Sequence, residues 1–90
     1  MEKQLEKCVD EICAMPSVNG ILCADNQGLC MAYKGIAAPK SAGVFTFLTK
    51  LASSLEPNNK PPVIQLDGKK TQILIKNTEN ITMAIYKSSQ

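Results

Sequence analysis

The stretch GILCADNQGLCMAYKG, residues 20–35, holds two short apolar runs separated by Asp-Asn-Gln-Gly. Each run is too short for a helix, and Gly28 can adopt the positive φ that a tight connection needs. The sequence therefore predicts a β-hairpin with strands over residues 21–24 and 29–33. A loop of two or four residues would place Cys23 opposite Cys30. Because the first run is apolar at every position, we expect its strand to be covered on both faces, in the interior of a sheet.

The bulk properties of the chain predict one small domain over residues 1–90. The chain has 10 basic and 8 acidic residues, a net charge of +2. The charges are scattered and the aromatic residues are not interleaved with lysine, which argues against nucleic-acid binding. The apolar runs fall short of the ~20 residues that span a bilayer. With no signal peptide and no lipidation motif, we expect a cytosolic protein without direct membrane insertion.

The cysteines raise an alternative of a different class, a thiol-redox or metal protein that uses Cys23 and Cys30. Zinc sites need closely spaced cysteine pairs or histidines, and this chain has no Cys-x-x-Cys pair and no histidine. Without an export signal the compartment is expected to be reducing. Free cysteines there pack as small apolar side chains. This packing interpretation is favoured for all four thiols, the other two being Cys8 and Cys13.

Two helices are predicted. The first is amphipathic and is ended by Pro16; its apolar stripe is Leu5, Cys8, Val9, Ile12 and Met15. The second covers residues 39–55, and its expected core stripe is Val44, Phe45, Leu48, Leu51, Ala52 and Leu55. Phe47 lies about 100° from the centre of that stripe, beside Gly43, Lys50 and Ser54. This position indicates either a second packed surface or the rim of the domain's own core.

Three short apolar runs, over residues 63–66, 73–75 and 81–86, are separated by turn residues and predict three more strands. Pro61 and Pro62 directly before the first of them favour an edge strand, whereas the last run favours a central one. The element order is then α-β-β-α-β-β-β, an α+β fold. We expect a five-stranded antiparallel sheet with a helix on each face and no third helix after the last strand.

The sequence contains no motif that supports catalysis. Lys40-Ser41 matches the end of a nucleotide-binding loop, but Lys34 and Pro39 occupy the two positions that the loop requires to be glycine. No serine has a base partner to activate it, and histidine is absent. We therefore expect no enzyme activity, no cofactor and no metal.

The element order and several local strings resemble the Roadblock/dynein light chain family, and most closely its Ragulator (LAMTOR) group. The strings are Pro16-Ser17, Gly20-x-Leu22-Cys23-x-Asp25-x-Gln27-Gly28-Leu29, Ala42-Gly43-Val44, Pro62-Val63 and Ile81-Thr82-x-Ala84-x-x-Lys87. They cover nearly the whole length of the chain. Cys30 and Tyr33, in the second predicted strand, depart from the family pattern.

The resemblance implies a non-catalytic scaffold subunit that pairs with another small Roadblock subunit through the second helix and third strand. A lipidated, belt-like subunit would hold the assembly at the cytosolic face of lysosomes and late endosomes. There the assembly would dock Rag GTPases for amino-acid signalling to the TOR kinase. An alternative with the same fold is a homodimeric GTPase regulator or dynein cargo adaptor. The expected partner-binding residues are Gly43, Phe47, Lys50, Ser54, Val63, Ile64, Gln65 and Leu66.

Overall fold

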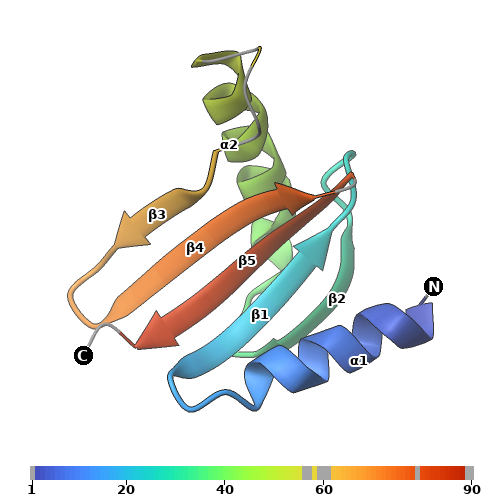
Figure 1. Ribbon diagram of the computed structural model, residues 1–90, viewed down its shortest axis with the longest axis vertical. Coiled ribbons are helices and arrows are strands. Elements are labelled where there is room, and N and C mark those ends of the chain that lie inside the picture. The colour runs from blue at the N-terminus through green and yellow to red at the C-terminus, as the bar shows by residue number, and fades with distance from the viewer. Residues whose placement is uncertain (1, 56–57, 59–61, 79, 89–90) are drawn as a thin grey trace.

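A computed structural model of the chain describes residues 2–55, 58, 62–78 and 80–88. Its elements are α1 (Glu2–Cys13), β1 (Val18–Ala24), β2 (Cys30–Gly35), a short 3-10 helix (Pro39–Ser41), α2 (Ala42–Leu55), β3 (Ile64–Asp67), β4 (Thr71–Thr78) and β5 (Ile81–Ser88). Figure 1 shows their arrangement. The order of helices and strands confirms the predicted α-β-β-α-β-β-β pattern.

The strands form one antiparallel sheet in the order β2-β1-β5-β4-β3. β5 is central and β1 lies beside it, as their apolar sequences predicted. β3 is an edge strand, which confirms the prediction made from the prolines before it. Of those two prolines, Pro61 lies outside the described residues, whereas Pro62 is described. β3 begins one residue later than expected, so that Val63 precedes the strand.

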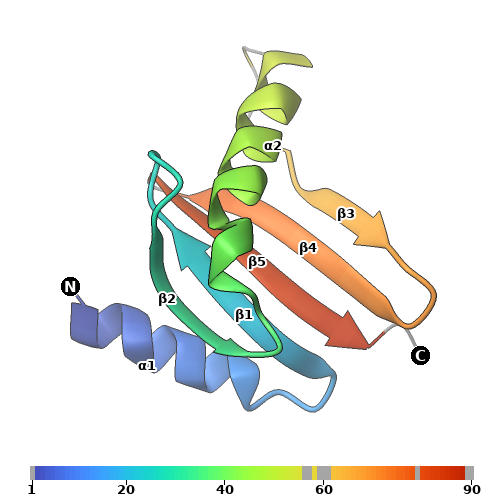
Figure 2. The same cartoon turned by 180° about the vertical axis from the view of Figure 1, so that it is seen from behind.

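The two helices lie on opposite faces of the sheet, as Figures 1 and 2 show together. The alternation of side chains along β1 produces these two layers. Ile21 and Cys23 pack with Val9 of α1, whereas Leu22 and Ala24 belong to the cluster beneath α2. All four β1 side chains are fully buried. The expected helix on each face is therefore present.

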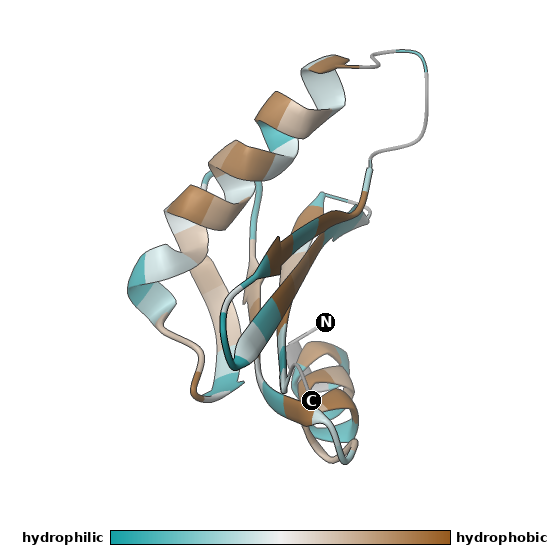
Figure 3. Ribbon diagram, turned by 90° about the vertical axis from the view of Figure 1, so that its left-hand side faces the viewer, coloured by the Kyte–Doolittle hydropathy of each residue, from teal (hydrophilic) through white to brown (hydrophobic). Residues whose placement is uncertain are grey.

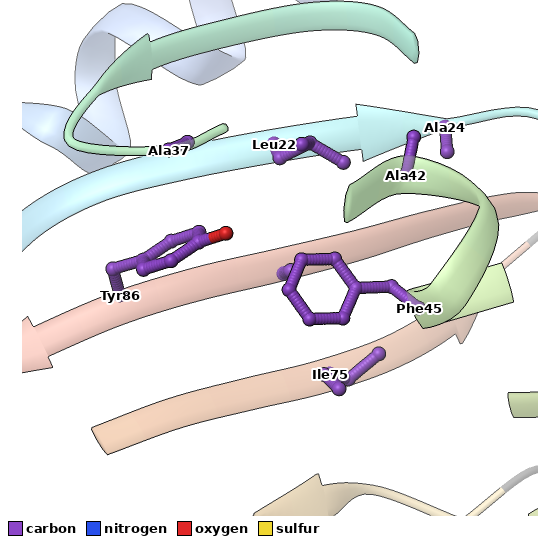
Figure 4. Packing of buried hydrophobic residues seen from close by; sticks show 8 residues of the cluster. Leu22, Ala24, Ala37, Ala42, Phe45, Ile75 and Tyr86 are labelled. Carbon is purple, nitrogen blue, oxygen red and sulfur yellow. The ribbon is translucent and has the colours of Figure 1, made fainter. Parts of the chain in front are cut away.

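The α2 face of the sheet is held by an aromatic pair (Figure 4). The ring of Phe45 meets Tyr86 of β5 edge-on, with ring centroids 6.1 Å apart and an interplanar angle of 73°. Leu22 and Ile75 belong to the same buried cluster. Such edge-to-face pairs add about 0.5–1.5 kcal/mol to the free energy of area burial. The prediction that Phe45 lies in the core is confirmed.

The predicted core stripe of α2 is confirmed at Leu48, which packs against the same cluster, and Ala52 is half-buried. At three other positions the predicted stripe is wrong. Val44, Leu51 and Leu55 are exposed, and the residues that α2 buries are Ala42, Phe45, Thr46 and Thr49. The buried hydroxyls are satisfied locally, because Thr49 Oγ1 donates to the carbonyl oxygen of Thr46 at 2.8 Å. Thr46 Oγ1 donates to the carbonyl oxygen of Asp25 at 3.3 Å. Hydrogen bonding thus allows a less apolar face of α2 to pack on the sheet.

The predicted pairing of Cys23 with Cys30 is also wrong. Cys23 is opposite Ala32, and the next pair is Ala24 with Cys30, so that Met31 has no partner in β1. This extra residue makes a β-bulge. The bulge adjoins the connecting turn, in which the Asp25 carboxylate accepts the backbone N–H groups of residues 27 and 29, each at 2.9 Å.

α1 follows its predicted stripe except at its end. Val9 is buried, and Leu5 and Ile12 pack partly against the same cluster. Met15, predicted to continue the stripe, is 53% exposed. The helix ends at Cys13, and the N–H of Val18 donates to the carbonyl oxygen of Met15 in a turn. Met15 therefore leaves the helical face on which the stripe depends.

Candidate partner-binding surfaces

The surroundings of Cys23 and Cys30 disfavour a reactive thiol centre at these two residues. Burial, followed by the neighbouring Cys8 and Cys30 thiols, raises the pKa of Cys23 to about 11. Burial also raises the pKa of Cys30. Because the thiolate is the nucleophile and metal ligand, these shifts disfavour both reactivities at neutral pH. No cluster of His, Cys, Asp or Glu suited to a metal ion occurs among the described residues.

The most apolar face of α2 points away from its own sheet. Val44, Phe47, Leu51 and Leu55 are 58%, 60%, 49% and 82% exposed. Their spacing of three and four positions puts them on one side of a helix. We call these four residues the α2 ridge. Figure 3 shows hydrophobic segments recurring along the length of α2. Apolar rows of this length on the surface of a small domain are typical of surfaces that contact another molecule.

The residues predicted from the sequence lie beside this ridge. Gly43, Phe47, Lys50 and Ser54 are all exposed. Phe47 belongs to the ridge itself. Lys50 is tethered, since its Nζ donates to the carbonyl oxygen of Asn26 at 2.9 Å. The Ser54 hydroxyl donates to the carbonyl oxygen of Leu51 at 2.7 Å.

The sequence did not identify the other three ridge residues as part of the surface. It assigned Val44, Leu51 and Leu55 to the core instead. The signal that could have found them was the excess of apolar positions on α2. An amphipathic helix that covers one face of a small sheet needs a single apolar stripe. α2 has large apolar side chains over a wider arc, which is more than one sheet face can cover.

The edge strand β3 contributes to the same side of the molecule. Ile64 pairs with Ile75, and Leu66 pairs with Ile73, so these two β3 residues face the α2 layer. Leu66 is still 39% exposed. Gln65, between them, faces the opposite layer. Figure 2 shows α2 lying across the sheet, with β3 as the outermost strand on one side. The predicted β3 residues are thus divided between the two faces.

A second apolar surface lies on the other face of the sheet. α1 covers β1 and β2 there and leaves β4 and β5 open (Figure 1). We call this region the open face. It holds a cavity of about 360 Å³ lined by Leu5, Val63, Leu74, Lys76, Thr78, Ile81, Met83 and Ile85. Within the described residues, no helix is long and apolar enough to cross a membrane.

The fold is that of Roadblock/LC7 domains. The structure of Myxococcus xanthus MglB superimposes with a TM-score of 0.84, covering 98% of this chain and 72% of that chain at 11% identity. A Roadblock/LC7 domain from Streptomyces avermitilis superimposes with a TM-score of 0.74, covering 100% of this chain and 79% of that one at 11% identity. At this identity the likeness concerns the fold alone.

Sequence comparison defines the family within this fold. The family model described as Ragulator complex protein LAMTOR5 matches residues 1–87. The LAMTOR5 homologue of Nematostella vectensis is 39% identical over 88 residues, 97% of each chain. LAMTOR5 of Xenopus tropicalis is 32% identical over 88 residues, again 97% of each.

The chain belongs to the LAMTOR5 family. The hepatitis B X-interacting protein, the individual Roadblock protein that the sequence strings resemble, is the same protein as LAMTOR5. The family consists of scaffold proteins rather than enzymes, which confirms the expectation that this chain is not a catalyst.

Proposed function

We propose that this chain is a scaffold subunit of a Ragulator-type complex, which docks Rag GTPases at the lysosomal surface for amino-acid signalling to the TOR kinase. The observation that carries the proposal is the α2 ridge in a chain of the LAMTOR5 family. The relatives are named as proteins of the Ragulator complex. An exposed apolar helix face next to a free strand edge is the surface that such a subunit needs for assembly.

The first partner in this proposal is another small Roadblock subunit, which binds α2 and β3. Its helix packs along the α2 ridge, with Gly43 allowing close approach and Lys50 and Ser54 at the polar border. Its edge strand adds to β3 along Ile64, Gln65 and Leu66, with Val63 at the start. The unpaired backbone groups of an edge strand support this extension of the sheet. Phe47 is the central aromatic anchor, the type of residue that dominates many interfaces.

The second partner is a lipidated, belt-like subunit that covers the open face. Leu74, Met83 and Ile85 are only partly buried there, although they are large and apolar. A helix or extended segment laid across β4 and β5 would remove these side chains from water. Such burial contributes roughly 25 cal/mol per Å² of apolar area. Through the lipids of this subunit, the chain would reside at the cytosolic face of lysosomes and late endosomes.

The pairing is tested by purifying the chain with a candidate Roadblock subunit and measuring the mass of the complex by light scattering. We expect a one-to-one heterodimer, and we expect Phe47→Asp to prevent its formation. A homodimer that does not bind the second subunit would instead favour the alternative of a GTPase regulator or cargo adaptor. Met15→Asp is the matched control, because Met15 is similarly exposed but lies far from α2 in the sequence, at the turn before β1.

Residence at the lysosome is tested separately, in cells that lack the lipidated belt subunit. We expect the fluorescently tagged chain to be diffuse in those cells and to return to lysosomes when the belt subunit is restored. Lysosomal staining that persists without the belt subunit would contradict a residence that depends on it.

A further inference from the structure

The sheet has a second free edge, formed by β2 at the end opposite β3. Figure 2 shows β2 as the outermost strand on that side. Leu29, Met31 and Tyr33, at or beside this edge, are 63%, 43% and 55% exposed. Neither the α2 ridge nor the open face includes these residues. We call these three exposed apolar residues along the edge the β2 strip.

The backbone of β2 is available for pairing at Tyr33. The N–H of Ile36 donates to the carbonyl oxygen of Asn19 at 3.1 Å, and the next pairs along the hairpin are Gly20–Gly35 and Ile21–Lys34. In an antiparallel ladder, hydrogen-bonded and non-hydrogen-bonded pairs alternate. Lys34 is therefore in the hydrogen-bonded set that points toward β1. Tyr33, the next residue, directs its N–H and C=O away from β1, toward the open edge.

The side of β2 that faces α1 borders a hollow. Its volume is about 470 Å³, and it is lined by Glu6, Val9, Asp10, Cys30, Met31, Ala32, Tyr33 and Lys34. A strand added beside β2 would send alternate side chains to the two faces of the sheet. Those on one face would enter this hollow beneath α1, and those on the other would lie beside Tyr33. The hollow thus gives the added strand a pocket as well as backbone partners.

The charge of the hollow favours a basic side chain in it. Lys34 Nζ lies 2.7 Å from Asp10 Oδ1, so the charges of these two side chains neutralise each other. Glu6 remains, with no ion pair among the side chains that the structure describes. Among the described side chains that line the hollow, one negative charge is therefore left uncompensated. A second copy of this chain would bring an identical acidic hollow to the same edge, so the charge favours a different partner.

We propose that the β2 edge binds an extended segment of a partner protein as an additional antiparallel or parallel strand. The segment alternates apolar and polar residues, and it presents one lysine or arginine to Glu6. Backbone hydrogen bonds to Tyr33 hold the segment, contacts with the β2 strip bury its apolar side chains, and the hollow selects the basic residue. This is strand addition to a sheet edge, with a charged pocket for specificity.

The test is a selection from a displayed library of random peptides, with the full chain as the target. The enriched peptides are then bound to the Tyr33→Pro variant. Proline removes the N–H that points to the open edge, a loss that an edge strand tolerates, and it also removes the Tyr33 ring from the β2 strip. We expect enriched peptides with alternating apolar residues and one basic residue, and at least tenfold weaker binding to Tyr33→Pro. In the wild-type complex the Tyr33 amide should exchange with solvent more slowly than in the free chain.

A second pair of variants keeps the test independent of the proline substitution. We expect Glu6→Gln to weaken binding by up to about fivefold, the range of an exposed ion pair. Glu11→Gln, on the same helix but outside the hollow, should leave binding unchanged. A Glu6→Lys variant should prefer peptides whose basic residue is replaced by glutamate. The proposal is overturned if no peptide is enriched, if the enriched peptides bind Tyr33→Pro as tightly as wild type, or if Glu6 and Glu11 variants behave alike.

Discussion

Phe45 and Phe47, two positions apart on α2, lie in opposite environments. Phe45 is 5% exposed and packs on Tyr86, whereas Phe47 is 60% exposed. Two helical positions differ by roughly 200° around the axis, at 3.6 residues per turn. One aromatic residue can therefore serve the domain's own core while the other serves an external contact. This separation allows the stability of the chain and its assembly to be tested by different substitutions.

The stability of the isolated chain should depend on Phe45 and not on Leu51. Phe45→Ala removes a buried ring, and we expect the free energy of unfolding to fall by about 3–5 kcal/mol. Leu51 is 49% exposed, so Leu51→Ala should change it by no more than ~0.5 kcal/mol. Urea denaturation followed by circular dichroism measures both. If Leu51→Ala lowered the free energy of unfolding by several kcal/mol, Leu51 would have to be a core residue.

Binding of the Roadblock partner should depend on Phe47. We expect Phe47→Ala to weaken the complex by ~2 kcal/mol or more, about thirtyfold in affinity, because a central aromatic anchor is lost. Isothermal titration calorimetry gives the affinity, and circular dichroism checks that the variant is folded. Met15→Ala provides the comparison for an exposed apolar residue outside the surface. Equal affinity of Phe47→Ala and wild type would place the interface elsewhere.

The end of β2 should tolerate no side chain at Gly35. Its φ is +70°, and an added Cβ would collide with the backbone oxygen of Asn19 and lie 2.8 Å from Cα of Gly20. Left-handed geometry alone costs a non-glycine residue ~1–2 kcal/mol. We expect Gly35→Ala to lower the unfolding midpoint in urea well beyond that cost.

The matched comparison for Gly35 is Gly43 of α2, where an added Cβ meets only the carbonyl oxygen of Gly28, at 3.9 Å. Gly43→Ala should stabilise the isolated chain by up to about 1 kcal/mol, since alanine favours the helix. If both substitutions destabilised the chain equally, backbone geometry at Gly35 would not be the cause.

The carboxylate of Asp67 should have a lowered pKa that depends on two glutamines. Gln72 Nε2 donates to it at 2.9 Å, and Gln65 Nε2 donates at 3.2 Å. These bonds, that from Gln72 first, hold the pKa of Asp67 below its ordinary value of 3.8. The resulting stabilisation is present above the ordinary pKa and is lost as the pH falls through the lowered one.

We expect Gln72→Ala to raise the pKa of Asp67, as measured by NMR titration of its carboxyl carbon. Gln27→Ala, in the hairpin turn before β2, should leave it unchanged. An unaltered titration in Gln72→Ala would exclude this hydrogen bond as the cause of the shift.

Cys23 should be the least reactive thiol of the chain. It is fully buried, and burial raises its pKa to about 11, so little thiolate is present at neutral pH. In a titration of the folded chain with a thiol reagent, Cys23 should react only as fast as the protein unfolds. Cys8, Cys13 and Cys30, which are partly exposed, should react sooner. Mass spectrometry identifies which cysteine has been modified. Rapid reaction of Cys23 in the folded chain would support the thiol-redox alternative.

Much of the fold follows from local sequence. The apolar runs and turn residues of the hairpin around Gly28, and the apolar runs near the C-terminus, predicted the strands and their order along the chain. The prolines before β3 predicted its edge position, since proline cannot donate to a ladder. Phe45 and Val9 were assigned correctly to the core. These features depend on interactions within a few residues, which sequence patterns describe well.

The face on which α2 packs was decided only in the tertiary structure. Periodicity identifies the most apolar side of a helix, but it does not say which molecule covers that side. Here Thr46 and Thr49 pack on the sheet, because backbone carbonyls accept the hydrogen bonds of their hydroxyls. Leu51 and Leu55 remain exposed to solvent. Contact between α2 and strands that are distant in the sequence fixed this outcome, and no local pattern contains that information. The bulge at Met31 is different, because the Asp25 bonds beside it lie within the turn. Turn residues alone left the loop length, and so the pairing register, open.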